Sequence, residues 1–150
     1  MKTKICSFLL FFAIGNSNAQ ILEPVKWKTR VEKISDSEFN LILKGTIDLG
    51  WHVYSQFTPV GGSLPMFLEF ENIKGNYELI GKAKESPYLK HFVDVFGVEE
   101  YYFENSVLIT QRIKIINPKT KKIGLHFEYQ TCKNGCINDT QDFIFEIKTI

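Results

Sequence analysis

Apolar residues recur at every second position along most of this chain. They alternate with charged residues over positions 25–31, and the same period returns over residues 39–43, 107–115, 123–129 and 143–147. Side chains two residues apart lie on one face of a strand, so this period predicts strands with one buried face and one exposed face. We expect seven or eight short strands and no strong amphipathic helix.

Short strands separated by turn residues are typical of an antiparallel sandwich. The predicted fold class is therefore all-β, an immunoglobulin-like antiparallel β-sandwich in a single domain, and a small closed barrel is the alternative. Gly45 interrupts one alternating run, which predicts a bulge or bend at that position. Residues 86–105 follow no regular period, and we expect a long loop there.

The first 19 residues have the pattern of a secretory signal peptide. A basic stretch precedes the apolar run ICSFLLFFAIG, and Ser17 and Ala19 supply the small residues of a cleavage site. Cleavage after Ala19 would remove Cys6 and leave residues 20–150 as the folded domain. The apolar run is short for a bilayer span, and an uncleaved anchor is the alternative. Export would place the domain where disulfides persist.

The charge of the chain argues against nucleic acid as a partner. Without Lys2 and Lys4, the 18 basic and 17 acidic residues become 16 and 17, a net charge of −1. Nucleic-acid-binding domains carry a basic face, so we expect no nucleic acid. No segment after the signal is apolar enough to cross a bilayer, and we expect a domain that does not span the membrane after cleavage.

The segment YQTCKNGCINDT holds both cysteines that follow Cys6. Cys132 and Cys136 flank a three-residue hairpin loop, for which Gly135 is expected in the left-handed conformation. Facing residues of an antiparallel pair have Cα atoms about 4.5 to 5.5 Å apart, a separation that suits a disulfide. A disulfide that closes a loop of about five residues stabilises a fold by only about 2 kcal/mol, so this bond would contribute little to stability.

Strand alternation predicts that Cys132 is accessible. Leu125, Phe127 and Tyr129 should face the core, whereas Cys132 should face outward or lie under a loop. An accessible and tightly closed disulfide is a candidate for exchange with an incoming thiolate. An inert hairpin disulfide remains the alternative from these residues alone.

Three stretches carry a resemblance to a known family. They are YQTC…C followed by a last alternating strand, GWHVYSQF at residues 50–57, and VDVFGVEEYYFENSVLITQRI at residues 93–113. In these stretches the chain resembles the N-terminal periplasmic domain of the thiol–disulfide interchange protein DsbD. The likeness covers nearly all of the chain after residue 19, and the family fold is an immunoglobulin-like sandwich. The resemblance implies a periplasmic location and a protein-disulfide reductase, or thiol–disulfide oxidoreductase, component that needs no cofactor.

The resemblance also implies an electron path. Cys132 and Cys136 would be the redox pair, and Cys136 would form the mixed disulfides. The donor would be the thioredoxin-like domain of a transmembrane thiol reductase, and the acceptors would be disulfide-containing client proteins of the periplasm. The chain lacks the membrane domain and the terminal thioredoxin-like domain of that family, so we expect the donor to be a separate protein.

Further site residues follow from the same resemblance. Phe96 would be a cap residue that shields the pair from stray oxidation, with Asp94 beside it, and Tyr54 and Tyr129 would help to line the site. The chain departs from the family in two features, because its cysteines stand closer together and the prolines that often follow the second cysteine are missing. Glu99-Glu100, within the same stretch as Phe96, is expected to be a solvated pair.

Other functions find weaker support in the residues. A mixed zinc or copper site built from the two cysteines and His52, His91 or His126 is a further alternative. The histidines stand singly and a structural zinc needs four ligands, so we expect no metal. No nucleophile elbow, zinc-protease motif or P-loop is present. The alternative function is a non-catalytic, secreted β-sandwich that binds a protein partner and carries a structural hairpin disulfide.

Overall fold

The computed structural model describes residues 22–148, and every regular element within them is a β-strand. The signal-peptide prediction, with Cys6 and Ala19, lies outside the described residues. In chain order the strands are β1 (Val25–Lys33), β2 (Glu38–Ile47), β3 (His52–Tyr54), β4 (Phe67–Phe70), β5 (Tyr77–Glu85), β6 (Leu89–Val93), β7 (Val98–Phe103), β8 (Ser106–Ile115), β9 (Lys122–Cys132) and β10 (Cys136–Glu146). Within this part of the chain, no helix has the length and apolar character needed to cross a bilayer.

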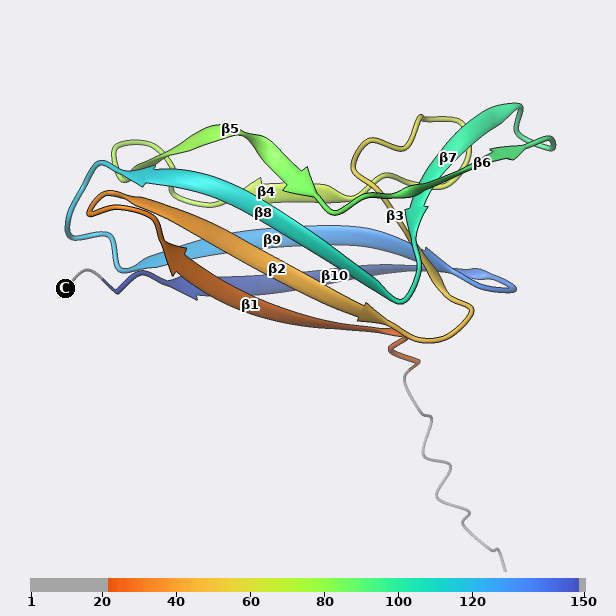
Figure 1. The fold of residues 1–150 in the computed structure, drawn as a ribbon, viewed down its shortest axis with the longest axis horizontal. Coiled ribbons are helices and arrows are strands. Elements are labelled where there is room, and N and C mark those ends of the chain that lie inside the picture. The colour runs from red at the N-terminus through yellow and green to blue at the C-terminus, as the bar shows by residue number, and fades with distance from the viewer. Residues whose placement is uncertain (1–21, 149–150) are drawn as a thin grey trace, which may run out of the picture.

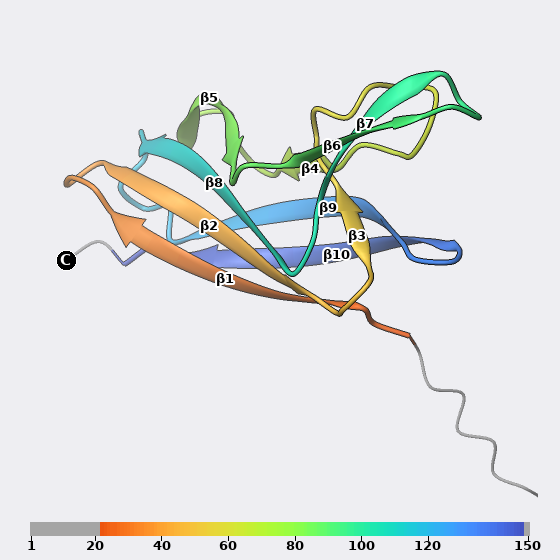
Figure 2. The same ribbon diagram turned by 45° about the vertical axis from the view of Figure 1, so that its right-hand side comes forward.

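The strands form two antiparallel sheets that lie face to face (Figure 1). The first sheet has the order β1-β2-β8-β5, and the second has the order β10-β9-β3-β7-β6, with β4 paired to β9 as well. Because the two sheets are separate, the fold is the predicted immunoglobulin-like sandwich rather than a closed barrel. The β6–β7 hairpin and the tip of the β9–β10 hairpin project at the same end of the molecule (Figures 1 and 2).

The core lies between the two sheets and is built from the alternating apolar residues that the sequence shows. Burial of these side chains is the main favourable term in folding. Trp27 packs against this core in two T-shaped ring contacts, and its ring centroid lies 4.8 Å from that of Phe127 and 5.2 Å from that of Tyr129. The largest fully buried apolar side chains are Phe39, Leu41, Leu43, Val53, Val107, Ile109, Ile113, Ile123, Leu125, Phe127 and Phe145.

The bulge or bend predicted at Gly45 is wrong. Gly45 continues an unbroken register, with Trp27 of β1 and Val107 of β8 as its Cα partners. A Cβ at this position would lie 2.7 Å from Trp27 Cζ3 and 2.9 Å from Val107 Cγ1. Glycine therefore stands here because two neighbouring side chains occupy the space that a side chain would need.

The long loop predicted over residues 86–105 is also wrong. Most of this stretch is a hairpin, in which β6 and β7 pair from Leu89↔Tyr102 to Val93↔Val98. No residue of β6 is buried, so the strand lacks the buried alternate positions by which sequence periodicity reveals a strand. The turn between the strands places Gly97 at φ 67°, a conformation that glycine adopts without steric cost.

Candidate functional site

The cysteine pair lies at the tip of the β9–β10 hairpin. Cys132 and Cys136 are Cα partners 4.1 Å apart, and their sulfur atoms are bonded at 2.00 Å. The predicted hairpin and its suitability for a disulfide are thereby confirmed. Gly135 does not have the positive φ expected of it, and the turn closes through a 3.1 Å hydrogen bond from the Lys133 N–H to the Gly135 carbonyl.

The two cysteines differ in their exposure to solvent. Cys132 is only 6% exposed, so the prediction that it is accessible is wrong, whereas Cys136 is exposed. The outward direction of Cys132 was nevertheless predicted correctly, because Tyr129 and the other core residues of β9 occupy the opposite face. Cys132 has a neighbouring strand on each side, because β9 lies inside the sheet and His52 of β3 is its second Cα partner. Cys136 belongs to β10, which is an edge strand.

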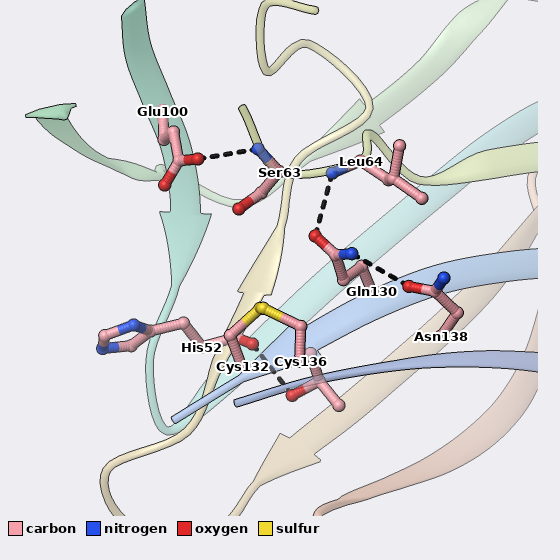
Figure 3. The surroundings of a disulfide bond; sticks show 9 residues. His52, Ser63, Leu64, Glu100, Gln130, Cys132, Cys136 and Asn138 are labelled. Carbon is pink, nitrogen blue, oxygen red and sulfur yellow. Dashed lines mark hydrogen bonds between the residues drawn. A yellow bond between two sulfur atoms is a disulfide. The ribbon is translucent and has the colours of Figure 1, made fainter. Parts of the chain in front are cut away.

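A network of hydrogen bonds adjoins the disulfide on the outward face of β9 (Figure 3). Gln130, two residues before Cys132, donates from Nε2 to Asn138 Oδ1 at 2.9 Å. The Leu64 N–H donates to Gln130 Oε1 at 2.9 Å. These bonds tie the chain segment between β3 and β4 to the hairpin immediately beside the cysteines.

A buried carboxylate on β7 holds the same segment from its other side. Glu100 is 7% exposed and accepts a 2.7 Å hydrogen bond from the Ser63 N–H. Among the described residues, no basic side chain lies within 4.0 Å of this carboxylate. The expectation that Glu99-Glu100 is a solvated pair is wrong for Glu100, because the chain near Ser63 folds over it.

Tyr54 and Tyr129, which the resemblance assigns to the site, lie on different faces. Tyr54 follows His52 by two residues on β3 and so shares the face of Cys132. Burial raises the pKa of Tyr54, and the negative charge of Glu100 raises it further, against a hydrogen bond with Ser63 that lowers it. The Tyr129 side chain faces the core, on the other side of the sheet from Cys132.

Tyr129 forms a polar contact at the core side of the hairpin. Its hydroxyl donates to Asp139 Oδ2 at 2.6 Å. Burial raises the pKa of Tyr129 above its ordinary value, and the interaction with Asp139 raises it further. Partial burial also raises the pKa of Asp139, but hydrogen bonds from Tyr129, Gln141 and the Thr140 N–H outweigh burial and hold that pKa below its ordinary value.

Phe96 and Asp94 lie in the turn between β6 and β7. Phe96 is 55% exposed, and Asp94 is exposed as well. Figures 1 and 2 show the tip of this hairpin apart from the tip that carries the disulfide. The structure therefore brings together Cys132, Cys136 and Tyr54, and it does not place Phe96 against the cysteine pair.

The histidines lie on three different strands. His52 Nε2 lies 3.0 Å from Glu104 Oε1, and His91 is on the exposed strand β6. His126 contacts Asp142 at 2.7 Å, and this hydrogen bond raises the pKa of the imidazole. In residues 22–148, no group of three or more His, Cys, Asp or Glu side chains is arranged to hold a metal ion.

The chain is similar to known proteins in both sequence and fold. The family model described as "Thiol:disulfide interchange protein DsbD, N-terminal" matches residues 18–147 of the chain. The N-terminal periplasmic domain of ScsB from Proteus mirabilis has a similar structure, with a TM-score of 0.63 and 13% identity over 83% of this chain and 47% of that one. This chain thus spans about half the length of the ScsB domain.

A second similar structure is a complex between the N-terminal domains of DsbD and PilB from Neisseria meningitidis. The TM-score is 0.50, with 12% identity over 80% of each chain. At these identities the two structures support the fold alone. No curated protein sequence matches the chain.

Proposed function

The chain belongs to the family of DsbD N-terminal domains, and from this membership we propose that it is a periplasmic thiol–disulfide exchange module. The family implies activity of the thiol–disulfide oxidoreductase type. The proposed electron path runs from the thioredoxin-like domain of a membrane-bound reductase, through Cys132 and Cys136, to disulfides of periplasmic proteins. The observation that carries the proposal is a bonded cysteine pair at a hairpin tip with Cys136 exposed.

The reaction needs two thiolates from the donor. The first attacks Sγ of Cys136, so a donor–Cys136 disulfide forms, the Cys132–Cys136 bond breaks and Cys132 leaves as a thiolate. The second donor thiolate attacks the donor sulfur of this mixed disulfide, which oxidises the donor and releases Cys136. Water supplies the protons that the two cysteines take up at neutral pH.

The reduced pair passes its electrons on by the reverse chemistry. The Cys136 thiolate attacks a client disulfide and forms a mixed disulfide, while one client thiolate leaves. Cys132 then attacks Sγ of Cys136, which restores the internal bond and releases the second client thiolate.

The proposed location and partner type agree with the descriptions of the two similar proteins. The ScsB domain is described as periplasmic, and the DsbD domain is seen in complex with a second protein domain, that of PilB. The signal-peptide pattern at residues 1–19 agrees with export to the same compartment. These descriptions support the proposed exchange in the periplasm with a thioredoxin-like donor.

Phe96 and Asp94 enter the proposal as a movable cap. The hairpin pairs with β3 at Val53↔Phe103 and Tyr54↔Tyr102, and Glu100 and Tyr101 of β7 also bond to the segment after β3. The turn at residues 94–97 is exposed and lies beyond these contacts, and exposed segments with few contacts favour local motion. In the proposed closed form, the turn of this hairpin bends toward the β9–β10 tip and Phe96 covers the cysteines.

A redox titration tests the proposed function. The protein is equilibrated with thioredoxin or glutathione buffers of graded potential, and the oxidised and reduced forms are quantified by mass spectrometry after thiol alkylation. We expect a midpoint above about −300 mV, the range of exchangeable disulfides. A bond that stays closed well below about −300 mV would identify a structural disulfide and favour the binding-module alternative.

A trapping experiment identifies the partner. With Cys132 replaced by Ser, a mixed disulfide on Cys136 has no internal thiol to resolve it. We expect Cys132→Ser to accumulate covalent adducts with a thioredoxin-like protein, whereas Cys136→Ser serves as the matched control and should accumulate few.

A further inference from the structure

Gln130 and Asn138 form the residue pair next to the disulfide on the same face of the hairpin. Cys132 and Cys136 are Cα partners, and so are Gln130 and Asn138 two residues further along each strand. Residues two apart share a face, so the Gln130 side chain stands directly beside that of Cys132. Figure 3 shows Gln130 between the disulfide and the segment at Ser63 and Leu64.

The Gln130 amide is bonded at both ends, which sets its orientation. Its oxygen accepts from the Leu64 N–H and its nitrogen donates to Asn138 Oδ1, each at 2.9 Å. A backbone N–H requires an acceptor, so only one amide orientation satisfies both bonds. The side chain is therefore held in one position beside Cys132.

The segment that holds Gln130 is itself anchored by Glu100. The Glu100 carboxylate accepts from the Ser63 N–H, and a hydrogen bond to a charged acceptor is stronger than one between neutral groups. A Cβ on Gly62 would lie 2.5 Å from Glu100 Oε1, so the absence of a side chain there permits this close approach. Burying a carboxylate without a basic partner is costly, which makes packing alone a poor explanation for Glu100.

These contacts lie beside Cys132, the less exposed cysteine of the pair. We propose that Gln130, held by Asn138 and by the Glu100-anchored segment, shields Cys132 and directs incoming thiolates and disulfides to Cys136. The inference rests on the proposed function and adds to it the residue that selects the reacting sulfur. Gln130 is thus a positioning residue, and Glu100 supports it through Ser63 and Leu64.

The shield has a chemical consequence for each half of the reaction. An external thiolate attacks Cys136 and expels Cys132, and the reverse step is an internal attack by Cys132 on the mixed disulfide. In both steps the only sulfur with which Cys132 exchanges a bond is that of Cys136. Shielding Cys132 therefore blocks attack by external thiolates and disulfides on Cys132 and does not hinder its internal attack on Cys136.

Peptide-resolved alkylation of the reduced protein tests the shield. The protein is reduced chemically and treated with iodoacetamide, and the rate at each cysteine is followed by mass spectrometry. We expect Cys136 to react faster than Cys132 in the parent. Gln130→Ala should speed the reaction of Cys132 about fivefold, the factor that corresponds to one net hydrogen bond, and leave Cys136 unchanged.

Matched variants separate shielding from general loosening of the hairpin. Gln141→Ala removes another glutamine of the same hairpin, one bonded to Asp139 and Tyr129 on the core side, and should leave both rates unchanged. Glu100→Ala should also speed alkylation of Cys132, whereas Glu100→Gln, which retains an acceptor for the Ser63 N–H, should restore the parent rate.

The pH dependence distinguishes shielding from a changed thiol pKa. Above both thiol pKa values the two cysteines are fully ionised. A change in the alkylation rate of Cys132 that persists there reports solvent access to this cysteine, whereas a change caused by a different thiolate fraction disappears. Equal rates at the two cysteines of the parent, or an unchanged Cys132 rate in folded Gln130→Ala, would overturn the inference. Circular dichroism checks that each variant is folded. If Gln130→Ala does not fold, Glu100→Ala takes its place, and an unchanged ratio of the Cys132 and Cys136 alkylation rates in that variant would overturn the inference.

This test is independent of the redox midpoint. A disulfide that resists the redox buffers would refute the proposed function, although the chemically reduced protein would still report the two alkylation rates. A normal midpoint with equal alkylation rates would refute the shield alone.

Discussion

Cys132 and Cys136 face each other at the end of one hairpin, yet Cys132 is 6% exposed and Cys136 is exposed. Strand position contributes to the difference, since β9 is flanked by β10 and β3 while β10 is an edge strand. The hairpin already holds the two residues 4.1 Å apart at their Cα atoms. A bond that joins residues which the sheet has already brought together adds little constraint and leaves one sulfur available for exchange.

Removal of the disulfide should therefore have a small effect on stability. We expect Cys132→Ser/Cys136→Ser to lower the free energy of unfolding by about 2 kcal/mol, because the closed loop has about five residues. Urea unfolding of the double variant and of the oxidised and reduced parent measures the difference. A loss above about 4 kcal/mol is expected only for a disulfide that closes a loop near 100 residues, and it would contradict a small stabilising role for this bond.

Gly45→Ala should destabilise the protein more than its small change in volume suggests. The added Cβ would lie within 3 Å of Trp27 and Val107, and overpacking of this kind costs about 1 to 3 kcal/mol. Urea unfolding of Gly45→Ala measures the loss. Gly135→Ala is the matched control, because a Cβ there meets no atom within 4 Å, and its unfolding free energy should remain close to that of the parent.

The contact between Tyr129 and Asp139 should appear as a pH-dependent contribution to stability. The pKa of Asp139 is lowered in the folded state, so its contribution is present above the unfolded pKa of about 4 and is lost as pH falls through the folded pKa. We expect Asp139→Asn to lower the unfolding free energy by about 1 kcal/mol at pH 7. The difference from the parent should shrink below about pH 4.

Unfolding curves at pH 7 and pH 3 provide this measurement. Asp48→Asn is the control, since Asp48 is exposed and makes no side-chain hydrogen bond or ion pair in the described structure. A difference between Asp139→Asn and the parent that stays constant across this pH range would contradict the assignment.

Much of the fold could be predicted because its causes are local in the sequence. The alternation at Leu125, Phe127 and Tyr129 gives the buried face of β9 directly, and the same period locates the other core strands. The spacing of Cys132 and Cys136 likewise identifies the hairpin that joins them. β6 escaped prediction because an edge strand exposed on both faces has no alternation to detect.

The surroundings of the disulfide could not be predicted, because they depend on contacts between distant residues. Leu64 and Gln130 are 66 positions apart, and Ser63 and Glu100 are 37 apart. Nothing near Glu100 in the sequence distinguishes a buried carboxylate from the exposed Glu99 beside it. The adjacent glycines at 61 and 62 were the only local sign of a close approach, and they do not name the residue that approaches.

Phe96→Ala tests the proposed cap. Phe96 lies in the turn between β6 and β7, and Figure 1 shows this turn apart from the β9–β10 tip, so Phe96 can shield the cysteines only if the turn moves toward them. We expect Phe96→Ala to speed alkylation of reduced Cys136 about two- to tenfold, the factor that corresponds to the loss of an aromatic contact. Val95→Ala is the matched control, because Val95 lies in the same turn and is 89% exposed, and it should leave the rate unchanged. Equal rates for Phe96→Ala and the parent would show that the hairpin does not close over the pair, and solvent access to Cys136 would then be set by the β9–β10 tip alone.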